Sequence, residues 1–168
     1  MMKLKKSDIN ILLIVLGLAI AAIAYFFVFT KLNEKTERIL TERFGKDTLI
    51  ALATSEDNVP YVRNVNAFYS DGAFYVITHA QSNKMRHIEK NPLVAVSGEW
   101  FTAHGKAYSL GYYGKEENVS IAAKLKQAFS EWIENGHMDF DDENTCIFCI
   151  RLTEGILFSE GVRYEIAF

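Results

Sequence analysis

The chain has 168 residues, of which 49% are apolar and 23% are charged, and its formal net charge is −3. This balance excludes an intrinsically disordered chain, which combines low hydrophobicity with high charge, and it suits one compact domain. A net negative charge argues against nucleic acid as a partner, and two cysteines are too few for a disulfide-dense scaffold.

The amino terminus carries a long apolar segment. Residues Ile9 to Phe29 hold no charged side chain, and about 21 helical residues span roughly 31 Å, which matches the hydrocarbon core of a bilayer. We therefore expect an uncleaved single-pass membrane anchor within residues 1–30. Two alternatives stay open: a signal peptide, because Ala22 and Ala24 are spaced as at a cleavage site, and a buried helix of a soluble domain. Basic residues on both sides of the segment leave its orientation open.

The rest of the chain is predicted to form a connecting helix, residues 31–45, followed by a domain of strands and helices, residues 46–168. Hairpin turns are expected at Asp71-Gly72 and at Glu154-Gly155, because such pairs favour tight turns between strands. The expected strands span residues 48–54, 59–69, 73–78, 93–97, 101–113, 145–152 and 156–166.

Two helices are expected among these strands. The first begins after Ser82, which can cap its amino terminus, and ends before Pro92. The second covers residues 117–135, whose apolar residues recur at helical spacing, and stops at Gly136. The fold class is therefore mainly β (α+β): a six- to seven-stranded antiparallel barrel with two or three helices, plus the amino-terminal membrane helix. A β-sandwich is the alternative.

The segment with the most chemical content follows the third expected strand, at residues 78–84. It carries hydroxyl and amide side chains and places Lys84 in the first turn of a helix. Backbone N–H groups at a helix start, Ser82 and Lys84 together suit an anion, and Arg63 on the preceding strand can add a bidentate contact to a phosphate. Residues 60–90 hold four basic and two acidic side chains in a chain that is acidic overall. Ordinary capping with solvated lysines is the alternative.

Four segments, in this order and at this spacing, resemble the flavin-binding core of the pyridoxamine 5′-phosphate oxidase-like family: Pro60–Val65, Thr78, Ser82–Lys84 and His87–Val94. The resemblance extends over residues 38–168. It implies an FMN-binding split β-barrel, with non-covalent FMN in two sites at the interface of a homodimer. It also implies an oxidoreductase that transfers two electrons between the flavin and a small-molecule substrate or a nicotinamide cofactor.

The resemblance assigns the candidate phosphate site. In the family, the arginine of the second strand and a Ser-x-Lys group after the third strand hold the FMN phosphate, and by position these are Arg63, Ser82 and Lys84. The family's threonine at the end of the third strand contacts the same end of the flavin and matches Thr78. Asn83 stands in the middle of the Ser-x-Lys group, where the family often has a basic residue. One positive charge that would face the phosphate is therefore missing.

The resemblance also implies contacts near the flavin ring. The backbone from Val62 to Val65, including Asn64 and Val65, would face the isoalloxazine, and Phe68 stands where the family has a lysine near the ring. Trp100 and His104 lie on or near the fifth expected strand, where family members line the ring or a substrate, and strand packing is the alternative. The carboxyl-terminal substrate motif of true pyridoxamine phosphate oxidases is absent, since the chain ends in SEGVRYEIAF. The resemblance therefore leaves the substrate and the catalytic residues unassigned.

No metal site is predicted. Cys146 and Cys149 lie three apart in an expected strand, so their thiols should face opposite sides, and no second cysteine pair completes a zinc site. They are expected to be buried structural thiols. Residues 137–143 have the composition of a ligand cluster without the spacing of a calcium loop, and they are expected to form a solvated loop.

A non-catalytic module that binds flavin or haem at a membrane is the alternative function, and a tethered structural domain is a third. Some split barrels bind haem through a histidine, and the candidates here are His79, His87, His104 and His137. We expect His87 to face out of its short helix and His79 to lie near the phosphate.

Overall fold

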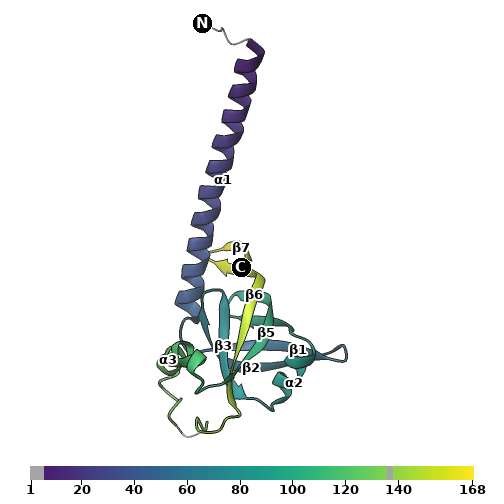
Figure 1. The fold of residues 1–168 in the computed structure, drawn as a ribbon, viewed down its shortest axis with the longest axis vertical. Coiled ribbons are helices and arrows are strands. Elements are labelled where there is room, and N and C mark those ends of the chain that lie inside the picture. Colours follow the sequence, from purple (N-terminus) through teal and green to yellow (C-terminus); the bar gives the residue numbers. More distant parts are fainter. Residues whose placement is uncertain (1–5, 136–137) are drawn as a thin grey trace. The chain divides into compact units, whose positions relative to one another are not determined.

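A computed structural model describes residues 6–135 and 138–168 of the chain. These residues belong to two compact units, with the division after Lys35, and helix α1 (Lys6–Phe44) begins in the first unit and ends in the second (Figure 1). In the first unit, the side chains of residues 15–26 are all exposed. The helix is near the amino terminus, its apolar window has a mean hydropathy of 2.1, and none of that window is buried. By length and composition it can cross a membrane, a property that signal sequences share, so the anchor stays a prediction.

The second unit is built on a closed antiparallel barrel (Figure 1). In the described residues the strands follow the order β3-β2-β1-β4-β5-β6, and pairing of β3 with β6 closes the ring. β7 pairs with the carboxyl-terminal part of β6. The strands are β1 (Thr48–Glu56), β2 (Val59–Ser70), β3 (Ala73–His79), β4 (Leu93–Gly98), β5 (Phe101–Tyr112), β6 (Thr145–Ser159) and β7 (Val162–Ala167). The predicted antiparallel barrel is confirmed, and the β-sandwich alternative is wrong.

Tight turns set the register of the hairpins. Asp71 and Gly72, with φ of 53° and 72°, join β2 to β3, as predicted. Asp57 and Asn58, with φ of 51° and 65°, join β1 to β2 in the same way. Positive φ at both central positions gives a twist that matches the twist of paired strands.

The predicted turn at Glu154-Gly155 is wrong, because β6 continues through both positions to Ser159. The turn lies further on, at Glu160 and Gly161, with φ of 53° and 75°. Gly155 instead lies at a close approach of two strands: a Cβ there would lie 3.0 Å from the carbonyl oxygen of Thr102 on β5. A β-bulge next to it, where the register shifts between His104 and Gly105, accompanies this close approach.

Two further helices lie against the barrel. α2 (Asn83–Lys90) has Ser82 as its N-cap, as predicted. α3 (Val119–Ala128) follows a short 3₁₀ turn, Glu116–Asn118. The predicted helix over residues 117–135 is therefore too long. Beyond α3 the chain turns, and Trp132 stacks on the ring of Phe129 at 4.9 Å and donates its indole N–H to Asp47. The predicted stop, Gly136, lies outside the described residues.

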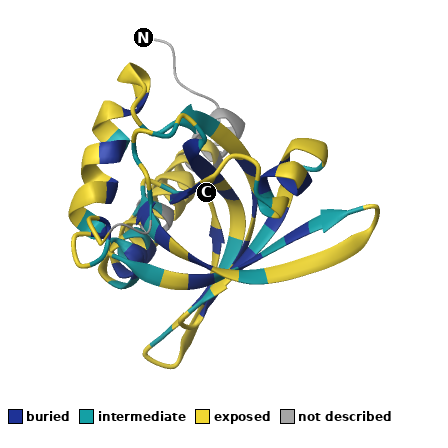
Figure 2. Cartoon of the chain, turned by 90° about the horizontal axis from the view of Figure 1, so that it is seen from below, coloured by how far each residue is buried: buried dark blue, intermediate teal, exposed yellow. Residues whose placement is uncertain are grey.

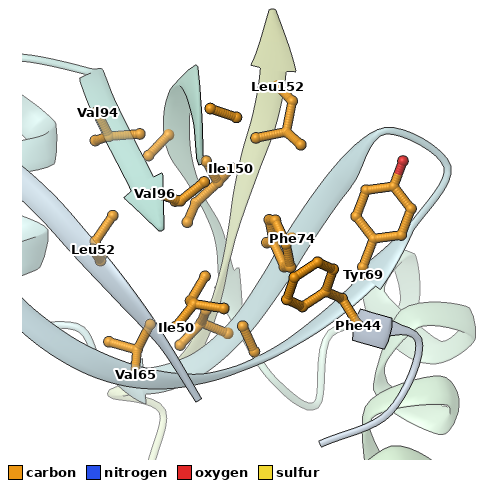
Figure 3. Packing of buried hydrophobic residues seen from close by; sticks show 14 of the residues in the cluster. Phe44, Ile50, Leu52, Val65, Tyr69, Phe74, Val94, Val96, Ile150 and Leu152 are labelled. Atoms are coloured by element: carbon orange, nitrogen blue, oxygen red, sulfur yellow. The ribbon is translucent and has the colours of Figure 1, made fainter. Parts of the chain in front are cut away.

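The barrel interior is one apolar cluster that includes the last turns of α1. Leu40 and Phe44 are fully buried, and the Phe44 ring lies 5.6 Å from Phe74 (Figure 3). Phe74 also contacts Tyr69 and Phe101, with ring centroids at 5.3 and 6.3 Å. The second unit therefore needs the end of α1 to complete its core.

A second apolar cluster covers the outer face of β3 and β6, beneath α3. It includes Ile77 and Ile147 from the strands and Leu125 from the helix. Buried residues alternate with more accessible ones along β1, β4 and most of β5, as expected for a period of two, whereas β3 and the first part of β6 are buried on both faces (Figure 2). Cys146 and Cys149 are both buried and unpaired, as predicted, and Cys146 belongs to the interior cluster.

A deletion of residues 1–30 should give a folded, soluble protein. It removes the exposed apolar part of α1 and keeps Ile39, Leu40 and Phe44, which are buried in the core. A deletion of residues 1–45 should not fold, because it takes these three side chains out of the core. Circular dichroism and size-exclusion chromatography measure both results. A soluble and cooperatively unfolding protein from the longer deletion would contradict this packing.

Candidate functional site

Lys84 lies in the first turn of α2 and reaches the end of β3. Its Nζ donates to Thr78 Oγ1 at 2.8 Å and to Ser82 Oγ at 3.5 Å. Burial, and next the positive charge of Arg63, lowers the pKa of Lys84 below its usual value. The structure thus brings together Thr78, Ser82 and Lys84, three of the residues that the sequence assigned to a phosphate site.

Arg63 comes from β2 and completes this cluster. Its Nη1 donates to Thr54 Oγ1 at 2.6 Å and lies 3.4 Å from the carbonyl oxygen of Leu52. Burial lowers the pKa of Arg63, as it does for Lys84. No carboxylate of the described residues forms an ion pair with either cation.

We call Arg63, Lys84, Thr78 and Ser82 the anion cluster. Two partly buried cations that repel each other and lack a carboxylate are costly until an anion binds between them. The hydroxyl groups of Thr78 and Ser82 accept from Lys84, so their own hydrogens can be donated to an anion. The donor set therefore suits a phosphate group.

Other predicted site residues lie outside this cluster. Asn83 is exposed, and its Oδ1 accepts from Arg86 at 3.3 Å rather than facing Lys84. Ser82 makes no capping hydrogen bond with its side chain. On β2, Val65 is buried inside the barrel and Asn64 is exposed on the opposite face. Roles for Asn64, Val65 and Asn83 at a flavin stay predictions.

The predicted ring contacts, Trp100 and His104, are both exposed. Trp100 lies in the turn between β4 and β5, with φ of 54° and 70% of its surface accessible. His104 Nδ1 lies 3.1 Å from Glu154 Oε1. No contact recorded within the described part of the chain joins either side chain to the anion cluster, so their roles stay predictions. Phe68 packs against the second apolar cluster.

His87 is buried, and the prediction that it faces out of its helix is wrong. Only 2% of its surface is accessible, Nδ1 lies 2.9 Å from Thr54 Oγ1, and Nε2 lies 3.4 Å from Glu56 Oε2. The polar end of β1 lies beneath α2 and supplies both partners. Glu56 lies beyond the first expected strand, residues 48–54, so no local pattern predicted this contact.

His79 and His104 are both exposed, and each lies beside a carboxylate. His79 is exposed, accepts from the backbone N–H of Gln81 at 3.2 Å, and lies 3.6 Å from Asp142 Oδ2. His137 lies outside the described residues. Where the structure describes the chain, no three His, Cys, Asp or Glu side chains are placed to hold a metal ion.

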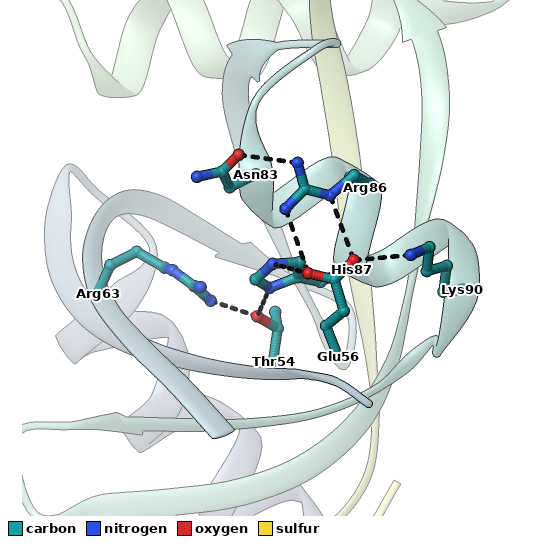
Figure 4. Close-up of polar contacts among 7 residues, drawn as sticks. All are labelled: Thr54, Glu56, Arg63, Asn83, Arg86, His87 and Lys90. Carbon is teal, nitrogen blue, oxygen red and sulfur yellow. Dashed lines mark hydrogen bonds and ion pairs between the residues drawn. The ribbon is translucent and has the colours of Figure 1, made fainter. Parts of the chain in front are cut away.

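Glu56 connects α2 to β1 (Figure 4). Its carboxylate accepts from Lys90 at 2.7 Å and from Arg86 at 3.3 and 3.2 Å, and it is 15% exposed. The hydrogen bond from Lys90, followed by that from Arg86, lowers the pKa of Glu56 to about 2. Because Lys84 is on the same helix, these contacts help to hold the anion cluster in place.

The protein should therefore lose stability in acid as the Glu56 carboxylate becomes protonated. Its pKa is about 2 in the folded chain and near 4.5 ordinarily, so its contribution is complete above the ordinary value and is lost as the pH falls toward 2. We expect Glu56→Gln to lower the urea midpoint at about pH 6 and to have little effect at about pH 2. Urea midpoints of the wild-type protein and the variant, compared across this pH range, measure the contribution of Glu56. A pH-independent difference would contradict the assignment.

The chain matches one family model, described as pyridoxamine 5′-phosphate oxidase, over residues 34–157. No curated protein matches it. Among solved structures, General Stress Protein 26 from Bacillus anthracis has 18% identity and a TM-score of 0.59, over 78% of this chain and 98% of that one. A FAD-binding protein from Mesorhizobium loti has 20% identity and a TM-score of 0.52, over 68% and 88%. An F420 reductase has 17% identity and a TM-score of 0.55, over 68% and 94%. At these identities the likeness shows the fold.

Proposed function

This chain belongs to the pyridoxamine 5′-phosphate oxidase family, and we propose that it is an FMN-binding flavoprotein and an oxidoreductase that acts on a small molecule. The family fold is shared by proteins whose names include FAD binding and F420 reduction. The substrate class is open between a small organic molecule and a nicotinamide cofactor. These relatives support a flavin as the ligand.

The observation that carries the proposal is the anion cluster. Arg63 and Lys84 present two positive charges with no carboxylate partner among the described residues. A phosphate monoester carries a charge of about −1.5 to −2 near neutral pH, which balances these two cations. FMN ends in such a monoester, so the donors present fit its phosphate.

FMN, when bound, supplies hydride and electron transfer chemistry. The chain's own residues bind and orient it. Arg63 and Lys84 neutralise the phosphate, while Thr78 and Ser82 donate their hydroxyl hydrogens to its oxygens. We propose that the ring attached to that phosphate extends along the backbone of β2 next to Arg63, at Asn64 and Val65, as the family resemblance implies.

We also propose a homodimer. The start of β2, directly before Arg63, exposes apolar side chains: Val59, Tyr61 and Val62 are 50%, 41% and 69% accessible. A second copy covering this strand would bury them and exclude water from the flavin. Val62→Glu should then give a monomer, as measured by light scattering. The same variant should bind FMN more weakly, as measured by fluorescence titration. A monomeric wild-type protein that binds FMN would contradict the dimer and leave the flavin site standing.

The apolar part of α1 is proposed as a single-pass membrane anchor. The exposed apolar side chains of residues 15–26 support it. Mass spectrometry of the protein recovered from membranes distinguishes the anchor from a signal peptide, because cleavage would remove the first residues. A shortened chain in the soluble fraction would contradict the anchor.

An absorbance spectrum of the purified protein tests the function. Flavin bands support the proposal, and a Soret band would instead indicate haem. Bleaching of the flavin bands by NADH or NADPH would then support an oxidoreductase. A bound flavin that neither nicotinamide nor candidate substrates reduce would favour the non-catalytic alternative.

A further inference from the structure

We propose that buried His87 is a positioning residue for the phosphate site, acting through Thr54 on the guanidinium of Arg63. The inference rests on the proposed function, because it concerns how the same site holds a phosphate. It assigns a role to a histidine that lies outside the family's phosphate-binding motif and makes no contact with Lys84 or Ser82 among the described hydrogen bonds.

Four side chains lie in a continuous row, in the order Arg63, Thr54, His87 and Glu56, and they come from β2, β1, α2 and β1 (Figure 4). Arg63 Nη1 lies 2.6 Å from Thr54 Oγ1, and the same oxygen lies 2.9 Å from His87 Nδ1. On the other side of the ring, His87 Nε2 lies 3.4 Å from Glu56 Oε2. Thr54 is therefore the link between the guanidinium and the imidazole.

The chemistry of the two ends assigns the direction of each hydrogen bond. A guanidinium has no acceptor, so Arg63 donates to the Thr54 oxygen. An ionised carboxylate only accepts, so His87 carries its hydrogen on Nε2, which faces Glu56. In the tautomer with its one hydrogen on Nε2, the Nδ1 atom is an acceptor, and the Thr54 hydroxyl donates to it.

This direction matters for Arg63. With its hydrogen donated to His87, Thr54 presents a lone pair to the guanidinium. Without the His87 acceptor, the hydroxyl hydrogen can turn toward Arg63, which places a donor against a donor.

The surroundings keep the imidazole in this orientation. His87 and Thr54 are only 2% and 3% accessible, so water does not replace a lost partner. The ring of Tyr61 on β2 lies 4.5 Å from that of His87. The charged groups that face this row are Glu56 with its partners Arg86 and Lys90.

The expected consequence is specific to phosphate. Arg63 has many rotamers, and fixing its guanidinium before FMN arrives lowers the entropy lost on binding. Loss of the His87 contact should weaken FMN binding by about 3- to 10-fold, the range of one ordinary hydrogen bond. Riboflavin, which lacks the phosphate, should bind the variant and the wild-type protein equally.

The test is a titration of FMN and riboflavin against five single variants, one of them a control, and one double variant. His87→Leu and Thr54→Val each remove one link and should weaken FMN binding alike, without change for riboflavin. His87→Asn keeps an acceptor near the Nδ1 position and should recover most of the affinity. Added to Arg63→Met, His87→Leu should cause no further loss. Glu89→Gln, at an exposed position of the same helix, is the matched control.

Three results would overturn the inference. The first is an equal loss of FMN and riboflavin affinity in His87→Leu, and the second is a further loss on the Arg63→Met background, since both indicate a general role in packing α2. The third is unchanged FMN affinity in Thr54→Val, which serves as the deciding variant where His87→Leu fails to fold. If the wild-type protein binds no FMN, the proposed function is wrong. If the wild-type protein binds FMN and one of the three results above is found, only the inference about His87 is wrong.

Discussion

Replacing both cations of the anion cluster, Arg63→Met with Lys84→Met, should weaken FMN binding by about 100- to 10,000-fold, since each charge-assisted contact contributes about 1.5–3 kcal/mol and each 1.36 kcal/mol is tenfold. Each single variant should lose about 10- to 100-fold. Fluorescence titration with FMN measures these affinities. The methionine side chains keep most of the packing, so the loss reports the charges.

The same substitutions should leave the ligand-free protein as stable as before. Burial lowers the pKa of both Arg63 and Lys84, the charge of Arg63 lowers that of Lys84 further, and neither has a carboxylate partner among the described residues. Removing them therefore takes away a repulsion rather than an ion pair. Thermal unfolding without FMN measures this. A large drop in the unfolding temperature would show that the pair has a structural role.

A matched control separates local charge from net charge. Lys106→Met with Arg163→Met changes the net charge by the same amount, at exposed positions of β5 and β7. We expect it to leave FMN affinity within about twofold, because exposed charges at a distance are screened by salt. Full FMN affinity in the Arg63 and Lys84 variants would remove the site assignment.

Phe74→Ala should destabilise the second unit by about 3–5 kcal/mol, the range for deleting a fully buried ring. Phe74 is fully buried and contacts the rings of Phe44, Tyr69 and Phe101. Urea unfolding of the protein lacking residues 1–30 measures the change.

Val119→Ala is the control for this loss, since 63% of the Val119 surface is accessible. It should change stability by no more than about 0.5 kcal/mol. A loss below about 1 kcal/mol in Phe74→Ala would show that the interior cluster is not packed as described.

Local signals in the sequence were enough to predict most of the barrel. Asp71-Gly72 is a turn pair whose conformation depends on its own two residues, and alternation along the strands marks which side faces the core. The candidate phosphate residues came from the family resemblance, and the structure brings Arg63, Thr78, Ser82 and Lys84 together.

Features that depend on distant segments could not be predicted. Gly155 resembles a turn residue in the sequence. In the structure it lies inside β6, where the carbonyl group of Thr102 on the neighbouring strand leaves little room for a side chain. The helical spacing of residues 117–135 does not show that Trp132 turns away to reach Asp47. His87 looked like a surface residue because its partners come from the end of β1, more than thirty positions earlier in the chain.

A comparison of FMN and riboflavin binding to the wild-type protein tests the central claim most directly. Calorimetric titration gives both affinities and the number of sites. A phosphate held by Arg63 and Lys84 predicts one FMN per chain and riboflavin binding at least about 100-fold weaker, the value of two charge-assisted contacts. Equal affinity for the two ligands, or no binding of FMN, would contradict it.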